Sequence, residues 1–144
     1  PDTYNGHQNI REFQRFMTLV GNYIEDAGVK KNRMIIQVSP FLKGEAFKWY
    51  QMEIANRENE ITLKDFFKLL YNWVFPPDYR QRQRDAWEKL YQGHKSVKEY
   101  AAEIRDLQDT IGIDSQREII QKFWCGLDEN IQDRLWMKDL DPDT

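Results

Sequence analysis

The chain has 144 residues, of which 21 are Lys or Arg and 24 are Asp or Glu, so its formal net charge is −3. That balance argues against a domain that binds nucleic acid through bulk positive charge. Apolar residues make up 40% of the chain and aromatic residues 14%, which is too rich in large side chains for a disordered segment. Few Gly and Pro together with 31% charged residues are typical of helices with solvated outer faces.

No apolar run exceeds three residues, whereas a membrane-spanning helix needs about 20. The N-terminus has neither a basic start nor an apolar stretch, so neither a membrane segment nor a signal peptide is expected. Cys125 is the sole cysteine, which excludes an intramolecular disulfide and fits a reducing, cytoplasmic compartment. The two histidines, His7 and His94, lie far from each other and from Cys125 in the sequence. No zinc site and no cofactor are therefore predicted.

Hydrophobic spacing of three and four residues predicts about eight helices and no convincing strand. In chain order the predicted helices cover about 10–27, 31–38, 44–59, 63–75, 79–91, 97–111, 115–125 and the segment from 129 on. The residues expected to cap or stop them are Asn9, Gly28, Pro40, Thr62 with Asp65, Asp78, Ser96 with Glu99, Gly112, Asp114, Gly126 and Asp128. A brief extended piece is expected around Thr3–Tyr4. These elements predict an all-α fold with short loops.

The double proline Pro76-Pro77 is the best candidate for a domain boundary. Residues 1–77 carry a net charge of +1 and residues 78–144 a net charge of −4. Two small helical lobes are therefore predicted, 1–77 and 78–144. Each lobe is expected to bury its own tryptophans, which are Trp49 and Trp73 in the first and Trp87, Trp124 and Trp136 in the second.

The sequence contains none of the common catalytic motifs: no Gly-rich phosphate loop, no G-x-S-x-G elbow and no H-E-x-x-H. The chain is therefore predicted not to be an enzyme. Arg80, Arg82 and Arg84 form the one notable basic cluster, and on a helix Arg82 lies nearly opposite the other two. A solvated or salt-bridged face explains this cluster better than contact with a polyanion.

Five blocks of residues occur in the same order as the motifs of a known family. They are Pro1-x-x-Tyr4-x-Gly6; Leu42-Lys43-Gly44-Glu45-Ala46-x-x-Trp49-Tyr50; Thr62-Leu63-x-x-Phe66-Phe67 followed by Phe75-Pro76; Gln92-Gly93-x-x-Ser96-Val97-x-Glu99-Tyr100; and Phe123-x-x-Gly126-Leu127. The ordered set resembles the capsid region of Gypsy-type (Metaviridae) long-terminal-repeat retrotransposon Gag, of a kind common in fungi. It is also similar to the two capsid lobes of the neuronal Arc protein, a domesticated relative.

The resemblance implies a capsid protein with N-terminal and C-terminal lobes that self-associates into a shell around element RNA. In that family the capsid protein is not an enzyme. The alternative is a domesticated interaction module whose N-terminal lobe binds a host peptide or protein. The N-lobe motif that carries the resemblance consists of Leu42, Gly44, Ala46, Trp49 and Tyr50.

The block from Gln92 to Tyr100 resembles a reduced major homology region of retroviral capsids. In that region a Gln, a Glu and an Arg tie a turn to a helix by hydrogen bonds. Here the spacing is one residue shorter, and Glu103 stands near the place where the Arg is often found. The residues assigned to this turn and to its helix cap are Gln92, Gly93, Ser96, Glu99 and Tyr100.

Two departures from the family affect the expected partners. No zinc knuckle follows, so RNA binding is expected only through parts absent from this chain. The family usually continues past residues 140–142 into another amphipathic helix, so the C-terminal lobe is expected to lack its last helix. The predicted partner is a second copy of the chain, because the helix after the major homology helix commonly carries the dimer contact in retroviral capsids. Ile120 and Trp124 are its candidate contact residues; ordinary core packing is the alternative for Trp124.

Overall fold

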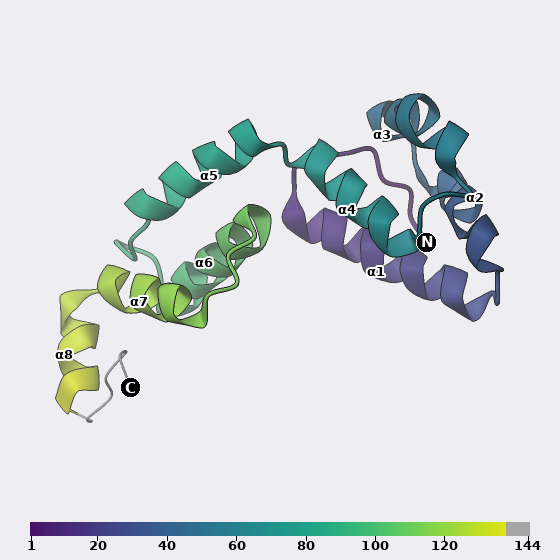
Figure 1. Cartoon of the computed structure of the whole chain (residues 1–144). Coiled ribbons are helices and arrows are strands. Elements are labelled where there is room, and N and C mark those ends of the chain that lie inside the picture. The colour runs from purple at the N-terminus through teal and green to yellow at the C-terminus, as the bar shows by residue number, and fades with distance from the viewer. Residues whose placement is uncertain (138–144) are drawn as a thin grey trace. The chain divides into compact units, whose positions relative to one another are not determined.

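The computed structural model describes residues 1–137, with the side chains of the last helix described as far as Arg134. The backbone divides into two compact units, Pro1–Pro76 (unit 1) and the part that begins at Pro77 (unit 2). The described residues form eight α-helices: α1 (Ile10–Asp26), α2 (Met34–Val38), α3 (Gly44–Trp49), α4 (Leu63–Val74), α5 (Pro77–Lys89), α6 (Val97–Ile111), α7 (Gln116–Gly126) and α8 (Glu129–Met137). The helices are shown in Figure 1.

The prediction of an all-α fold is confirmed. Within the described residues the only β-type pairing is an isolated parallel bridge between Tyr4 and Leu42. The Tyr4 N–H donates to the Phe41 carbonyl at 2.8 Å, and the Lys43 N–H donates to the Tyr4 carbonyl at 2.9 Å. The extended piece predicted near Thr3–Tyr4 is therefore a single rung against the chain before α3.

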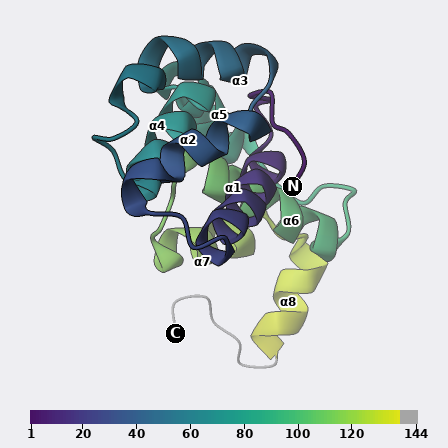
Figure 2. The ribbon, with the colours of Figure 1, turned by 90° about the vertical axis from the view of Figure 1, so that its right-hand side faces the viewer.

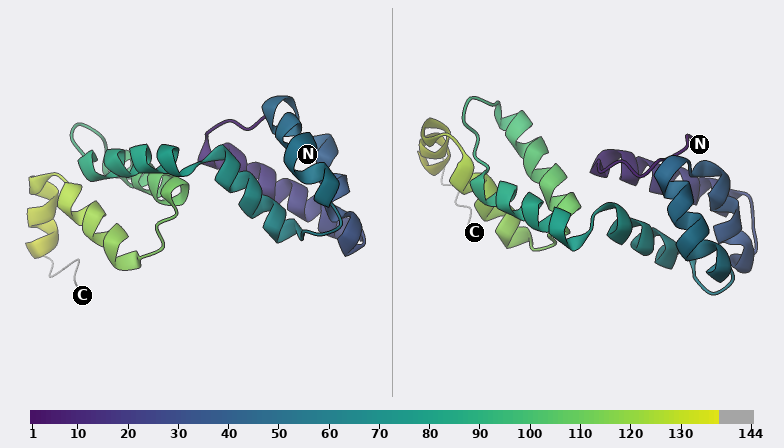
Figure 3. Two further views of the ribbon diagram at one scale, coloured as in Figure 1. Left: turned by 45° about the horizontal axis from the view of Figure 1, so that its top comes forward. Right: turned by 90° about the horizontal axis from the view of Figure 1, so that it is seen from above.

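In unit 1, α1 and α4 lie side by side and α2 packs against both (Figures 1 and 3). Figure 2 shows α3 along the top of this unit. The Asn9 side chain accepts hydrogen bonds from the N–H groups of Arg11 and Glu12, as its predicted capping role requires. Apolar side chains at spacings of three and four then point into a largely aromatic core. The buried apolar side chains of α1 and α4 are Ile10, Phe13, Phe16, Val20, Ile24, Phe66, Leu70 and Val74.

The segment between α1 and α4 folds in shorter pieces than the sequence predicted. The helix predicted over 31–38 begins as a 3₁₀ turn, and only Met34–Val38 is α-helical. The helix predicted over 44–59 is α-helical only as far as Trp49. It continues as a π-helical turn over Tyr50–Ile54 and a 3₁₀ turn over Ala55–Arg57. Hydrophobic spacing alone does not distinguish these tighter and wider turns from a regular helix.

The capping box predicted before α4 is confirmed in both directions. The Asp65 N–H donates to Thr62 Oγ1 at 3.1 Å, and the Thr62 N–H donates to the Asp65 carboxylate at 3.5 Å. Asp65 thus replaces the usual Glu, and two amides at the start of α4 find acceptors.

In unit 2, α6 packs against both α5 and α7, and α8 follows α7 (Figure 3). The buried apolar core consists of Trp87, Tyr100, Ile104 and Leu127. Trp124 is only partly buried, and Trp73 of unit 1 is also partly buried, whereas Trp49 and Trp87 are buried as predicted. The predicted burial of Trp136 lies outside the described side chains.

Two predicted caps in unit 2 are wrong, by two residues at α5 and by one residue at α7. α5 begins at Pro77 itself, because the fixed φ and missing N–H of a proline suit the first helical position. Asp78 therefore lies inside the first turn. α7 is capped by Ser115, whose Oγ accepts from the Glu118 N–H at 3.3 Å, and not by Asp114.

Candidate functional site

Gln92 is the buried polar centre of the turn between α5 and α6, with only 5% of its surface exposed. Its amide nitrogen donates to the Lys95 carbonyl at 2.9 Å, and its amide oxygen accepts from the Asp128 N–H at 2.8 Å. The Gln92 backbone N–H donates to the Gly126 carbonyl at 2.7 Å. One residue therefore closes the turn and ties it to the end of α7 and the start of α8.

A second tie joins the same turn to α6. Lys95 Nζ lies 3.0 Å from the Glu103 carboxylate, and both side chains are about half-buried. The resemblance implied an Arg on the helix, whereas here the carboxylate is on the helix and the cation is on the turn. The sequence interpretation missed Lys95, although it lies in the turn and Glu103 lies two helical turns along α6.

Only half of the capping box predicted before α6 forms. Ser96 Oγ accepts from the Glu99 N–H at 3.0 Å, and Gly112 ends the helix in a left-handed conformation as predicted. Among the hydrogen bonds of these two residues, the reciprocal bond from the Ser96 N–H to the Glu99 carboxylate is absent. Ser96 is therefore the cap, and Glu99 contributes only its backbone amide.

Tyr100 connects α6 to α7 from inside the core. Its ring is fully buried and stacks on Phe123 with centroids 5.6 Å apart. Its hydroxyl donates to the Lys122 carbonyl at 2.7 Å. Burial, reinforced by the nearby Cys125 thiol, raises the pKa of Tyr100 to about 12.

Gly126 is required by the position of that tyrosine. A Cβ placed on Gly126 would overlap the Tyr100 hydroxyl oxygen and lie 2.7 Å from Cζ. The sequence predicted Gly126 as a helix stop; the structure shows that it also leaves room for the tyrosine. Packing against Tyr100 therefore explains why a glycine stands in the Phe123-x-x-Gly126-Leu127 block.

Two arginines of the basic cluster on α5, Arg82 and Arg84, are engaged in ion pairs. Arg84 pairs with Glu118 on α7, and its Nε lies 3.5 Å from the Glu88 carboxylate. Arg82 lies 3.8 Å from Asp78. These contacts favour the salt-bridged interpretation of the cluster over a polyanion site.

The outer face of α7 carries the candidate dimer contact. Ile120 is 45% exposed, whereas Trp124 is partly buried and packs against the core together with Ile119 and Phe123. Beside Ile120 runs a groove of about 450 Å³ between α6 and α7. The structure thus separates the two predicted contact residues: Ile120 faces outward, and much of Trp124 belongs to the core.

The N-lobe motif is a packing motif in unit 1. Leu42, Ala46, Trp49 and Tyr50 are all buried. Gly44 has a φ of +56°, which a residue without Cβ adopts readily at the first position of α3. Tyr50 donates a hydrogen bond from its hydroxyl to Glu58, and burial together with this carboxylate raises the pKa of Tyr50.

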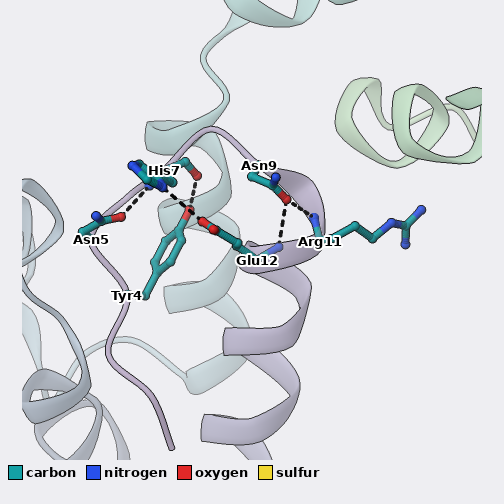
Figure 4. Close-up of polar contacts among 6 residues, drawn as sticks. All are labelled: Tyr4, Asn5, His7, Asn9, Arg11 and Glu12. Carbon is teal, nitrogen blue, oxygen red and sulfur yellow. Dashed lines mark hydrogen bonds and ion pairs between the residues drawn. The ribbon is translucent and has the colours of Figure 1, made fainter.

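The N-terminal segment is anchored to the start of α1 (Figure 4). The Tyr4 hydroxyl donates to the His7 carbonyl at 2.6 Å, and His7 Nδ1 lies 3.3 Å from the Glu12 carboxylate. Burial and the nearby Glu12 raise the pKa of Tyr4. A groove of about 430 Å³ runs along this segment and includes the apolar Phe16 and Leu19 of α1.

Among the residues that the structure describes, no group of three or more His, Cys, Asp or Glu is placed to hold a metal ion. Across that same part of the chain, no helix combines the length and apolar character that a membrane crossing requires.

Residues 84–144 match the family model of the PEG10/RTL1 C-terminal capsid-like domain. Unit 2 is similar to a Gag-derived capsid domain. The match begins inside α5 and includes the Gln92 turn, the Tyr100–Gly126 contact and the outer face of α7. No curated protein and no solved structure gives a significant match to the chain.

Proposed function

We propose that this chain is the structural capsid protein of a retrotransposon Gag and self-associates into a shell around element RNA. The similarity of residues 84–144 to a capsid-like domain supports a capsid-type function. The order of the sequence blocks supports a Gypsy-type (Metaviridae) element of the fungal kind. The proposal assigns the chain no catalytic activity and no cofactor, and it assigns the shell to the cytoplasm.

The observation that carries self-association is the exposure of Ile120. Ile120 is 45% exposed, and burying a branched aliphatic side chain against a partner removes apolar surface from water. This removal lowers the free energy of the associated state. Ile120 lies beside the α6–α7 groove, so a second copy finds both a projecting side chain and a recess. We expect the contact to be two-fold, with the same surface on both copies.

Sedimentation equilibrium of the whole chain tests this proposal. Ile120→Asp is expected to convert a concentration-dependent dimer into a monomer. Because the side chain lies outside the core, this monomer is expected to melt at the same temperature as the wild type diluted to its monomeric state. Leu19→Asp, at an exposed leucine of α1, is the matched control and is expected to leave the dimer intact. A wild-type chain that stays monomeric at high concentration contradicts the proposal.

Trp124→Ala separates the two roles considered for that residue. Loss of the dimer with an intact melt indicates an interface role. A collapsed melt indicates that Trp124 is a core residue, which is the outcome its packing against the unit 2 core favours. Electron microscopy of concentrated protein then shows whether shells form.

RNA binding by this chain alone is expected to be weak. The net charge is −3, and ion pairs engage Arg82 and Arg84. Few phosphates are neutralised by such a surface, so its affinity depends little on counterion release. Titration of labelled RNA near physiological salt tests this expectation; sub-micromolar affinity contradicts it.

A second candidate function is a domesticated module that binds a host peptide through unit 1. The groove along the N-terminal segment favours it, because its wall combines the half-exposed Leu19 with charged Glu12 and Arg15. An intact gene without a neighbouring reverse transcriptase frame favours this alternative, whereas an adjacent frame favours an element.

A further inference from the structure

A second groove in unit 1 is lined by apolar side chains and by charged side chains. Its volume is about 360 Å³, and Trp49, Met52 and Trp73 form its apolar walls. The two indole rings stack with centroids 5.5 Å apart, and Met52 is 78% exposed. Met52 is therefore the exposed apolar side chain of this groove, and methionine adapts well to the shape of a partner.

The rim of this groove, which we call the acidic groove, carries a net negative charge. Its charged residues are Glu45, Lys48 and Glu53. Lys48 Nζ lies 3.1 Å from the Glu45 carboxylate, so that pair is neutral. Glu53 forms no ion pair with any described residue, and it therefore favours a cationic partner.

The turn between α1 and α2 has the complementary character. Lys30, Lys31 and Arg33 are exposed, and none of them forms an ion pair within the described part of the chain. Val29 and Met34, which flank these cations, are half-buried. This basic turn (29–34) therefore presents apolar side chains bracketed by three positive charges.

The basic turn cannot fill the acidic groove of its own unit. Figures 1 and 2 show it at the end of α1, well away from α3. A contact between the two surfaces therefore joins different copies. It is heterologous, with different surfaces on each side, and such contacts repeat into rings or open chains.

We propose that the basic turn of one copy docks into the acidic groove of the next copy, through Lys30 and Lys31 at the rim and apolar contact with Met52. The inference rests on the proposed self-association and adds a second contact, in unit 1. It is separate from the Ile120 surface, so the two contacts together extend a dimer into a larger assembly.

Charge reversal with mixing tests this pairing. Variant A carries Glu45→Lys and Glu53→Lys; variant B carries Lys30→Glu and Lys31→Glu. In each variant alone the two surfaces carry like charge, and assembly beyond the dimer is expected to weaken by about tenfold or more. In an equimolar mixture every contact between a copy of A and a copy of B joins opposite charges, so alternating assembly is expected to recover. Lys64→Glu with Lys68→Glu, on the exposed face of α4, is the control for net charge.

Light scattering and sedimentation of the full chain decide between the outcomes, and circular dichroism checks that each variant is helical. Recovery in the mixture, with an unaffected control, supports the pairing. If neither charge-reversal variant changes assembly, this inference is wrong and the Ile120 proposal is unaffected. A wild-type chain that never exceeds a monomer overturns both. If a reversal variant does not fold, Met52→Gln gives the same decision: unchanged assembly overturns the pairing.

Discussion

Unit 1 and unit 2 are both helical, but they bury very different amounts of apolar side chain. Among the described residues, 17 apolar side chains are buried in unit 1 and 4 in unit 2. The two buried polar side chains, Gln92 and Thr110, both belong to unit 2. Unit 2 thus relies more on buried hydrogen bonds, whereas unit 1 relies more on aromatic packing.

This difference indicates which unit gains more stability from association with a second copy. Apolar side chains of α7 that are only partly buried remain available to a partner, and burial against a second copy would stabilise unit 2 by mass action. A small core is sensitive to the loss of any one member. We therefore expect unit 2 to unfold first and to gain most from association.

The largest expected effect is that of Trp87→Ala. Removing a tryptophan that is 2% exposed costs about 3–5 kcal/mol, enough to unfold unit 2. Hydrogen exchange measured by mass spectrometry is expected to show lost protection in α5 to α7 and retained protection in α1 and α4. Phe66→Ala, at a fully buried position of unit 1, is the counterpart. Loss of protection in both units after Trp87→Ala would show that they unfold together.

Gly126→Ala is expected to rank next. The new methyl group would overlap the Tyr100 hydroxyl, and overpacking of this kind costs about 1–3 kcal/mol. Gly21→Ala in α1 is the matched control, because its Cβ would meet nothing nearer than a Phe67 ring atom at 4.0 Å. That change is expected to stabilise unit 1 by up to about 1 kcal/mol through helix propensity. Chemical denaturation that shows equal effects for both changes would refute the packing role of Gly126.

Gln92→Leu and Gln8→Leu together compare the loss of a buried side-chain amide with the loss of an exposed one. Gln92→Leu leaves the Asp128 N–H and the Lys95 carbonyl without their partner, which costs about 1–3 kcal/mol. Gln8→Leu removes the hydrogen bond to the Val74 carbonyl from an exposed side chain in unit 1. Its effect on the denaturation midpoint is expected to be smaller, because water replaces the lost partner.

Alkaline pH is expected to weaken unit 2 through Tyr100. Its pKa rises from 10.0 to about 12 in the folded chain, so the fold favours the neutral phenol. The stabilisation this represents is complete below about pH 10 and is lost as the pH rises toward about 12. Burial lowers the pKa of Lys122, which acts in the opposite direction. Denaturation midpoints between these pH values are expected to fall less steeply in Tyr100→Phe than in the wild type.

The sequence predicted those features that depend on neighbours along the chain. The capped start of α4 at Thr62 and the end of α6 at Gly112 follow from local hydrogen bonding and glycine geometry. It did not predict the π-helical turn after Trp49, because buried residues four apart fit either helix type. Nor did it predict the Lys95–Glu103 pair or the reason for Gly126, since both depend on contacts between elements that only the folded chain brings together.

The smallest expected effects compare the helix caps of the two units. The Thr62–Asp65 box is formed in both directions, whereas Ser96 caps α6 without a returning bond from Glu99. Thr62→Ala and Ser96→Ala are both expected to cost about 1 kcal/mol, a lowering of roughly 4–8 °C in the melting temperature of a unit of this size. Asp65→Ala is expected to cost several tenths of a kcal/mol, because an amide loses its acceptor and the helix loses a favourable charge. Glu99→Ala keeps the backbone amide that Ser96 binds, and it removes only the interaction of its charge with the helix dipole. Thermal melts that show a larger loss for Glu99→Ala than for Asp65→Ala would mean that the Glu99 carboxylate acts through a contact beyond the cap, such as one with a second copy.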